Sequence, residues 1–325
     1  MKIAVVGCGA LGSYYGARLA RAGRQVHFLL RSDYEAVRRR GVHVRSNEGN
    51  FHVNPRCAKT PEEIGVCDLV IIGLKTTANH TFPHLLPPLI GNHSAVLTLQ
   101  NGLGNEAQLA AIFPAEQILG GLCFVCLNRD APGEIQHIAH GRIVLGEYRG
   151  WPEPRTHDIA GMIRHSGVPC DVTDNLARAH WEKLVWNIPF NGLGVASAAG
   201  YDAVLRGNSE VGQPLGRCLT TDILLGTPRW RELVSQLMHE VIRSAQALGL
   251  DVPDAAAEKQ VERTLDMGAY KASTLIDFER GQPLELEALF LEPLRQAEKA
   301  GIETPRLAAL CRLLKKLDSA NEAKR

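Results

Sequence analysis

The stretch KIAVVGCGALGSYYGARLARAGRQVHFLLR, residues 2–31, sets the fold class of the first half of the chain. Its apolar run over 3–6 ends at a glycine and is typical of a strand buried on both faces. A helical pattern follows over 10–22 and closes at Gly23, and a second strand is predicted over 25–30. Strand, helix and strand in this order predict a βαβ unit and therefore a parallel sheet.

The turn between the first strand and the helix has the pattern of a dinucleotide-binding loop. In that position Gly7 permits a tight turn, Gly9 lets the backbone approach a pyrophosphate, and Gly12 allows close packing of the helix. The helix N-terminus then faces the anion. The candidate cofactor-binding residues of this loop are Gly7, Cys8, Gly9, Ala10, Leu11 and Gly12.

The end of the second strand indicates which nucleotide is read. An Asp or Glu there would accept the ribose 2′-hydroxyl of NAD, but the chain has Arg31 instead. A guanidinium suits a 2′-phosphate, so NADP is favoured. Asp33 keeps NAD open as an alternative, since its carboxylate could turn inward and accept the ribose hydroxyls.

The apolar runs 68–74 and 95–99 continue the parallel sheet, and 42–53 alternates like a hairpin. From 120 to 148 we expect an antiparallel extension, with turns at 128–133 and 140–141. After about residue 173 helical patterns dominate. The sequence thus predicts an α/β fold, with a doubly wound Rossmann sheet that binds NADP over 1–173 and a second, all-α domain that binds substrate over 174–325. The long helical patterns cover 176–197, 230–248, 253–267, 284–299 and 305–317.

Two polar residues follow strands of this sheet. Lys75 comes after one apolar run, and Asn101 comes after the next. Ligands of open α/β sheets bind along the carboxyl ends of the strands. A polar residue at a strand end is also commonly a solvated cap, but the pair favours a role near the nicotinamide.

The second half contains the stretch WEKLVWNIPFN, residues 181–191. Lys183, Asn187 and Asn191 are spaced i, i+4, i+8 and form one polar stripe on an otherwise apolar helix. The stripe favours a site in a cleft, although a lone lysine on such a helix often extends to solvent. Pro189 would free the carbonyl of Val185 within the helix.

Further on, Ser273 and Glu285 lie in the stretch ASTLIDFERGQPLELE, residues 272–287. Spacing alone does not show that they meet. A serine near a helix start is usually a cap, and a lone glutamate is usually on the surface.

The order GCGALG, LLR, LKTT, QNGLG, WEKLVWN and ASTLIDFERGQPLELE resembles the 2-dehydropantoate 2-reductases, or ketopantoate reductases, over almost the whole chain. The resemblance implies an N-terminal Rossmann domain for NADPH and a helical C-terminal domain. It implies that Lys183 is the catalytic lysine and Glu285 the active-site glutamate, and that Asn187, Asn191 and Ser273 bind the substrate. Lys75 and Asn101 match cofactor-side residues, with Asn101 also a candidate for the substrate, and Arg31 matches the residue near the 2′-phosphate.

The function expected from this resemblance is the NADPH-dependent reduction of 2-dehydropantoate to pantoate, a step of pantothenate biosynthesis, with Lys183 as general acid. Tyr201, Phe290 and Leu291 depart from the pattern of the family, which leaves the exact 2-oxo acid open. The alternatives are a reductase of another 2-oxo acid on the same fold and a non-catalytic sensor of NADP(H).

Composition excludes several other classes of protein. The chain has 325 residues, with 36 basic and 35 acidic side chains, which argues against a nucleic-acid partner. No apolar run is long enough for a membrane span. Eight scattered cysteines indicate reduced thiols and a cytoplasmic location, and no metal site is expected. The long apolar helices permit a homodimer without requiring one.

Overall fold

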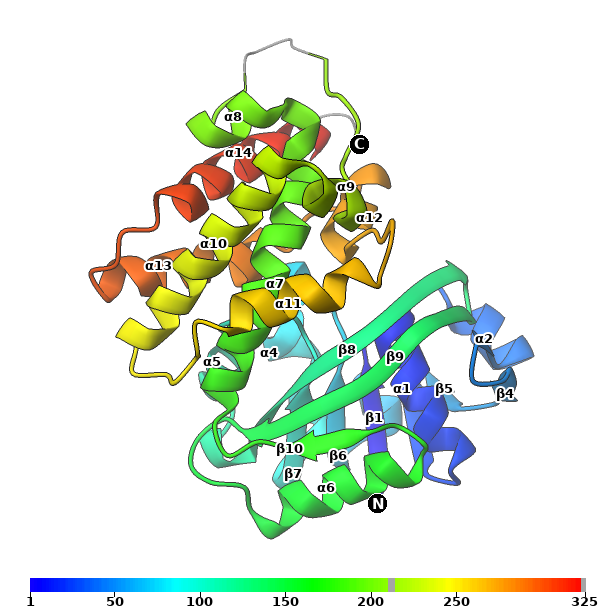
Figure 1. The fold of residues 1–325 in the computed structure, drawn as a ribbon. Helices are drawn as coiled ribbons and strands as arrows, with labels where there is room; N and C mark the ends of the chain where they lie inside the picture. Colours follow the sequence, from blue (N-terminus) through cyan, green and yellow to red (C-terminus); the bar gives the residue numbers. More distant parts are fainter. Residues whose placement is uncertain (210–213, 323–325) are drawn as a thin grey trace. The chain divides into compact units, whose positions relative to one another are not determined.

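The computed structural model describes residues 1–209 and 214–322, and the chain divides into two compact units, Met1–Leu176 and Ala177–Arg325. The first unit is a mixed sheet with helices on both faces, and the second contains only helices among its described secondary-structure elements (Figure 1). The predicted fold class is confirmed. None of the helices in the described parts of the chain is long and apolar enough to cross a bilayer.

The first unit is built on a sheet in the order β4-β3-β9-β8-β7-β6-β1-β2-β5, with β10 paired to β9. The strands from β8 to β5 run parallel, as a doubly wound fold requires. Only β8–β9 and β3–β4 pair antiparallel among the described strands. The strands are β1 Lys2–Val6, β2 Gln25–Leu29, β3 Val42–Ser46, β4 Phe51–Val53, β5 Arg56–Ala58, β6 Cys67–Ile72, β7 Ile90–Thr98, β8 Ile118–Ala131, β9 Glu134–Glu147 and β10 Cys170–Val172.

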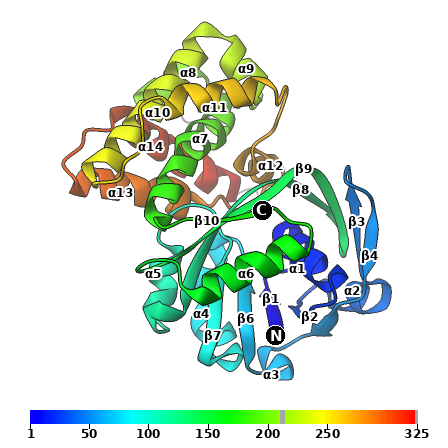
Figure 2. The ribbon, with the colours of Figure 1, turned by 60° about the horizontal axis from the view of Figure 1, so that its bottom comes forward.

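Each face of this sheet has its own hydrophobic core, because successive residues of a strand point to opposite faces. Ile3 and Val5 of β1 pack with residues of α1 and α6, whereas Ala4 and Val6 pack with residues of α3, α4 and α5. These helices are labelled around the sheet in Figure 2. The helical segments of this unit are α1 Ala10–Arg21, α2 Tyr34–Arg40, α3 Pro61–Ile64, α4 Phe82–Leu85, α5 Asn105–Ala110 and α6 Pro154–His165, with the short 3₁₀ turns η1 Thr76–Thr81, η2 Pro87–Leu89 and η3 Ala115–Gln117.

The β8–β9 hairpin corrects one prediction. The expected turn at 140–141 is wrong: these residues lie within β9, in a bulge where the register against β8 shifts and His140 has φ +66°. The bulge inserts an extra residue without ending the strand. Most of the turn expected at 128–133 is also part of the paired strands, since β8 continues to Ala131. Two 14-residue strands result, which reach far beyond the parallel sheet.

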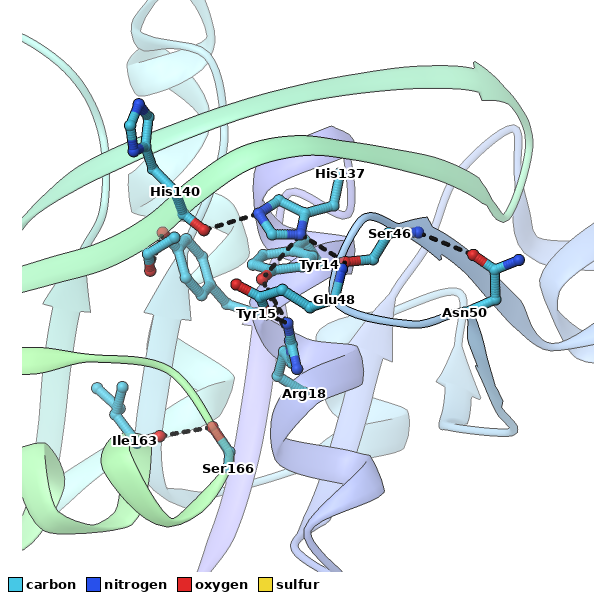
Figure 3. Close-up of polar contacts among 11 residues, drawn as sticks. Tyr14, Tyr15, Arg18, Ser46, Glu48, Asn50, His137, His140, Ile163 and Ser166 are labelled. Carbon is cyan, nitrogen blue, oxygen red and sulfur yellow. Dashed lines mark hydrogen bonds and ion pairs between the residues drawn. The ribbon is translucent and has the colours of Figure 1, made fainter.

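A buried polar cluster fastens this bulge to α1 (Figure 3). His137 donates from Nε2 to the carbonyl of His140 at 2.8 Å, and its Nδ1 accepts from the Ser46 hydroxyl at 2.8 Å. Tyr15 of α1 donates to the carbonyl of Gly141 at 3.1 Å. Arg18, on the same helix, is ion-paired with Glu48 of the β3–β4 turn. The helix that the glycine loop opens is therefore braced from two hairpins.

The second unit is organised around α7, a 21-residue helix that continues through Pro189. The predicted helices all exist, but the one expected from 284 begins at Leu286 and opens with a π-helical segment. Three helices of only six or seven residues, α8, α9 and α12, were not predicted. The described helical segments are α7 Leu176–Ala196, η4 Ser197–Ala199, α8 Tyr201–Arg206, α9 Thr221–Gly226, α10 Pro228–Ala247, α11 Ala256–Leu265, α12 Ser273–Glu279, η5 Glu287–Leu291, α13 Glu292–Lys299 and α14 Pro305–Glu322.

Candidate active site

The glycine loop between β1 and α1 has the geometry of a phosphate cradle. Gly7 has φ +93°, and a Cβ on it would lie 2.3 Å from the backbone nitrogen of Leu74. A Cβ on Gly12 would lie 2.2 Å from the carbonyl oxygen of Gly7. Both positions therefore require glycine. Gly9 differs, because its Cβ would meet nothing within 4 Å, so the backbone before α1 is open to a ligand.

The other residues of the loop hold it in place. Cys8 and Leu11 pack against the core on the α1 side of the sheet, and the Ser13 hydroxyl donates to the carbonyl of Cys8 at 2.9 Å. Burial raises the pKa of the Cys8 thiol well above its usual range. A raised pKa disfavours the thiolate, which is the nucleophilic form of cysteine.

The two candidates at the end of β2 lie in different environments. Arg31 is exposed, and its carbonyl accepts from the backbone of Tyr34 at 3.2 Å. Asp33 is buried, with its carboxylate 2.6 Å from the Arg129 guanidinium and 3.0 Å from the Ser32 hydroxyl. The carboxylate that kept NAD open is thus already paired within the protein.

A buried amide network joins the loops that follow β6 and β7. Gln100 donates to the carbonyl of Leu74 at 3.0 Å and to the Asn79 side chain at 2.7 Å. Asn79 donates to Asn105 at 3.0 Å, and Asn105 donates to the carbonyl of Asn101 at 3.1 Å. Satisfied networks of this kind fix the conformation of the backbone that they bond.

This network positions the two polar candidates of the sheet edge. Lys75 is the exposed residue directly after Leu74, and Asn101 directly follows Gln100. Since β6 and β7 are parallel neighbours, both residues lie at the same edge of the sheet. That edge also carries the glycine loop, which follows β1 beside β6.

In the second unit, α7 carries the polar stripe as predicted from its spacing. Asn187 and Asn191 are buried and Lys183 is half-buried. The Asn191 side-chain oxygen accepts from the Ser273 hydroxyl at 3.3 Å and from the Thr274 backbone at 3.1 Å. The structure therefore brings together two substrate candidates that lie 82 positions apart in the chain.

Aromatic contacts fix the orientation of α7. Trp186 donates to the Thr264 hydroxyl of α11 at 2.9 Å, and its ring packs against Phe190 at 5.1 Å and Tyr270 at 6.2 Å between centroids. Because Trp186 immediately precedes Asn187, these contacts limit rotation of the helix. The stripe is consequently held at a defined angle in the unit.

Glu285 is also buried, with 6% of its surface exposed, and it stands just before the helical turn that begins at Leu286. The π-helical segment η5 follows, and such segments are frequent at functional sites. Phe290 of this segment packs on α7, where a Cβ on Gly192 would lie 3.0 Å from its ring. Glu285 therefore leads into a segment that contacts the helix of the stripe.

Sequence reasoning missed the residues that support the candidates. Asn79, Asn105 and Arg129 are not singled out by the sequence, because Asn79 bonds to Asn105 across 26 positions and Arg129 meets Asp33 across 96. The one available signal was the dipeptide Gln100-Asn101 at a strand end. Within the described residues, no group of three or more His, Cys, Asp or Glu could hold a metal ion.

Comparison with known proteins decides the family. The family described as Ketopantoate reductase PanE/ApbA matches residues 3–150, and its C-terminal counterpart matches residues 211–318. The chain belongs to the ketopantoate reductase family. A curated 2-dehydropantoate 2-reductase of a Nostoc species is 41% identical, over 98% of this chain and 96% of its own.

Solved structures of the ketopantoate reductase family agree with this fold. A crystal structure of 2-dehydropantoate 2-reductase from Geobacter metallireducens is 44% identical, with a TM-score of 0.89, and the match covers 97% of this chain and 99% of that one. Another, from Methylococcus capsulatus, is 32% identical with a TM-score of 0.87, covering 99% and 98%.

Two departures from the pattern of the ketopantoate reductases have structural explanations. The Tyr201 ring packs edge-on against Trp230 at 4.9 Å, with the Arg229 guanidinium above it at 5.0 Å. Phe290 is fully buried in the core of its unit. Both side chains are therefore engaged in packing within the second unit.

Proposed function

We propose that this protein reduces 2-dehydropantoate to pantoate with NADPH. The observation that carries the proposal is the 41% identity to a curated 2-dehydropantoate 2-reductase over nearly the full length of both chains. The polar stripe of α7 and its bond to Ser273 support it independently. In this proposal residues 1–173 bind the nucleotide and residues 174–325 carry the substrate residues.

The glycine loop fits the cofactor, since Gly9 leaves the backbone open where a pyrophosphate would approach. Arg31 would bind the 2′-phosphate, and Lys75 and Asn101 would contact the nicotinamide side. The pairing of Asp33 with Arg129 favours NADP over NAD. When bound, NADPH supplies the hydride to the ketone carbon and leaves negative charge on the ketone oxygen.

Lys183 would stabilise that oxygen and donate a proton to it. Glu285 would orient the Lys183 ammonium and a hydroxyl group of the substrate. Asn187, Asn191 and Ser273 would hold the carboxylate and hydroxyl groups, and Asn101 is a further candidate for binding the substrate. Such orientation makes the transfer effectively unimolecular, which lowers its barrier.

The test follows NADPH absorbance with purified protein, supplied with 2-dehydropantoate or with a panel of smaller 2-oxo acids. We expect the highest kcat/KM with 2-dehydropantoate. Faster turnover of another 2-oxo acid would favour the alternative reductase. Tight NADPH binding without oxidation by any of them would favour a non-catalytic sensor.

A further inference from the structure

The buried Asp33 carboxylate has both of its oxygens engaged by donors of its own chain. Oδ2 lies 2.6 Å from Nη1 of Arg129, and Oδ1 accepts from the Ser32 hydroxyl at 3.0 Å. The side chain of Asp33 is only 8% exposed, whereas that of Arg129 is 44% exposed. The ion pair between Asp33 and Arg129 is therefore partly shielded from water. A charge-assisted hydrogen bond in such a place is stronger than one at the open surface.

This carboxylate stands on the nucleotide side of the sheet. Asp33 is two residues beyond Arg31, and it immediately precedes α2. Its negative charge is near enough to the glycine loop to add to the rise in the pKa of the Cys8 thiol, after burial and Cys57. An unpaired carboxylate here would attract ribose hydroxyls and repel a 2′-phosphate.

Arg129 reaches this place because the β8–β9 hairpin is anchored at its tip. Past the end of β8, the carbonyl of Gly133 accepts from the backbone of His43 at 2.8 Å. A Cβ on Gly133 would lie 2.8 Å from the carbonyl oxygen of Gly41, so the turn packs closely on the end of α2. The tip of the hairpin that carries Arg129 is thus fixed against the end of α2, and Asp33 stands just before the start of the same helix.

We propose that Arg129 is a specificity residue for NADPH, which acts by neutralising and restraining the Asp33 carboxylate two residues from Arg31. The inference rests on the proposed use of NADPH. Arg129 acts through Asp33, so it is a positioning residue. Within the described chain Asp33 is the one carboxylate that its guanidinium meets.

The experiment measures dissociation constants of NADPH and NADH by titration calorimetry for the wild type, Arg129→Met, Asp33→Asn and the double variant. Arg129→Met should weaken NADPH binding about tenfold relative to NADH, since a bare carboxylate is then left near the 2′-phosphate. Asp33→Asn should leave NADPH binding at least as tight. In the Asp33→Asn background, Arg129→Met should change the NADPH/NADH ratio little, because its partner charge has gone.

Two further variants separate this role from general support of the fold. Arg129→Lys keeps the charge and should restore most of the preference for NADPH. Arg142→Met is the matched control, because it removes an arginine of β9 whose exposed partner, Asp171, lies 2.9 Å away, and it should leave the ratio unchanged. Thermal unfolding of every variant checks that the fold is intact.

The outcomes distinguish this inference from the proposed function. The inference is overturned if Arg129→Met shifts the NADPH/NADH ratio by the same factor in the wild type and in the Asp33→Asn background. It is also overturned if Arg129→Met weakens the binding of both nucleotides equally. In either case the reductase proposal stands. If the wild type binds NADH as tightly as NADPH, the proposed cofactor preference fails and this inference fails with it. Turnover of 2-dehydropantoate is measured separately and tests the reaction itself.

Discussion

Lys183 stands one turn before Asn187 on α7 and is half-buried. If it donates the proton to the ketone oxygen, Lys183→Ala should lower kcat by about 10²- to 10⁴-fold, the usual cost of losing a general acid. NADPH affinity should stay unchanged. Steady-state kinetics and nucleotide titration measure both quantities, with Lys259→Ala, at an exposed lysine of α11, as the control. A near-normal kcat would show that Lys183 is not the general acid and that its side chain only extends to solvent.

Ser273 begins α12 and bonds to the Asn191 side chain. Ser273→Ala should raise KM for the 2-oxo acid by about 2- to 10-fold, because one neutral hydrogen bond to the substrate is lost. Asn191 would keep its bond from the Thr274 backbone, so its orientation should survive. The measurement is KM and kcat together with the NADPH dissociation constant. Unchanged kinetics with a lower melting temperature would make the serine purely structural.

Glu240 of α10 caps α14 across the second unit. Its carboxylate accepts from the backbone of Arg306 at 3.0 Å and of Leu307 at 2.8 Å, two N–H groups in the first turn of α14 that no helical carbonyl can bond. Glu240→Ala should lower the free energy of unfolding by about 1–3 kcal/mol, since buried donors are left unsatisfied. Urea titration measures the change. Glu232→Ala, at an exposed position of the same helix, should have little effect, and an equal loss there would contradict the capping role.

Helices and strands with long, strongly periodic patterns can be predicted from the sequence. Residue types that are common in turns led to a wrong prediction. The order from β1 to β2 follows from one stretch of chain, and α7 was predicted to within a residue of its end. The bulge at 140–141 was mistaken for a turn, because His-Gly reads as a break unless the ladder beside it is known. The short helix α12 cannot be predicted in this way, because its seven residues are too few to show a helical hydrophobic pattern.

The candidate site was predictable only as separate pieces. The spacing on α7 predicts the stripe, but the bond between Asn191 and Ser273 depends on how distant helices pack. The pairing of Asp33 with Arg129 likewise joins residues 96 positions apart, so Asp33 was read as a free carboxylate. Contacts at such separations carry no local sequence signal. The roles of Lys183, Glu285 and the other candidates stay predictions for the experiments above.

The division after Leu176 predicts that the first unit folds by itself. A fragment of residues 1–176 should fold and bind NADPH within about tenfold of the full chain, because the cofactor candidates from Gly7 to Asn101 all lie in this unit. It should keep Leu176, whose side chain packs at Gly120 and Gly146. Calorimetric titration and an NADPH oxidation assay check the prediction: we expect binding and no turnover. A folded fragment that cannot bind would show that the second unit holds the nucleotide.

The long apolar helices permit a homodimer, and the mass of the full chain in solution tests whether one forms. Sedimentation equilibrium of the full chain should give twice the monomer mass if the apolar helices pair. A monomer mass across the micromolar range would rule the dimer out under those conditions.

The strands that end the branches of the sheet, β4, β5 and β10, have only three residues each. Short edges offer few free backbone groups to a strand of another molecule, which protects against aggregation through edge-to-edge pairing. Such protection matters here because a net charge of +1 provides little mutual repulsion in concentrated solution. At these three edges, protection therefore comes from the shortness of the strands rather than from charge.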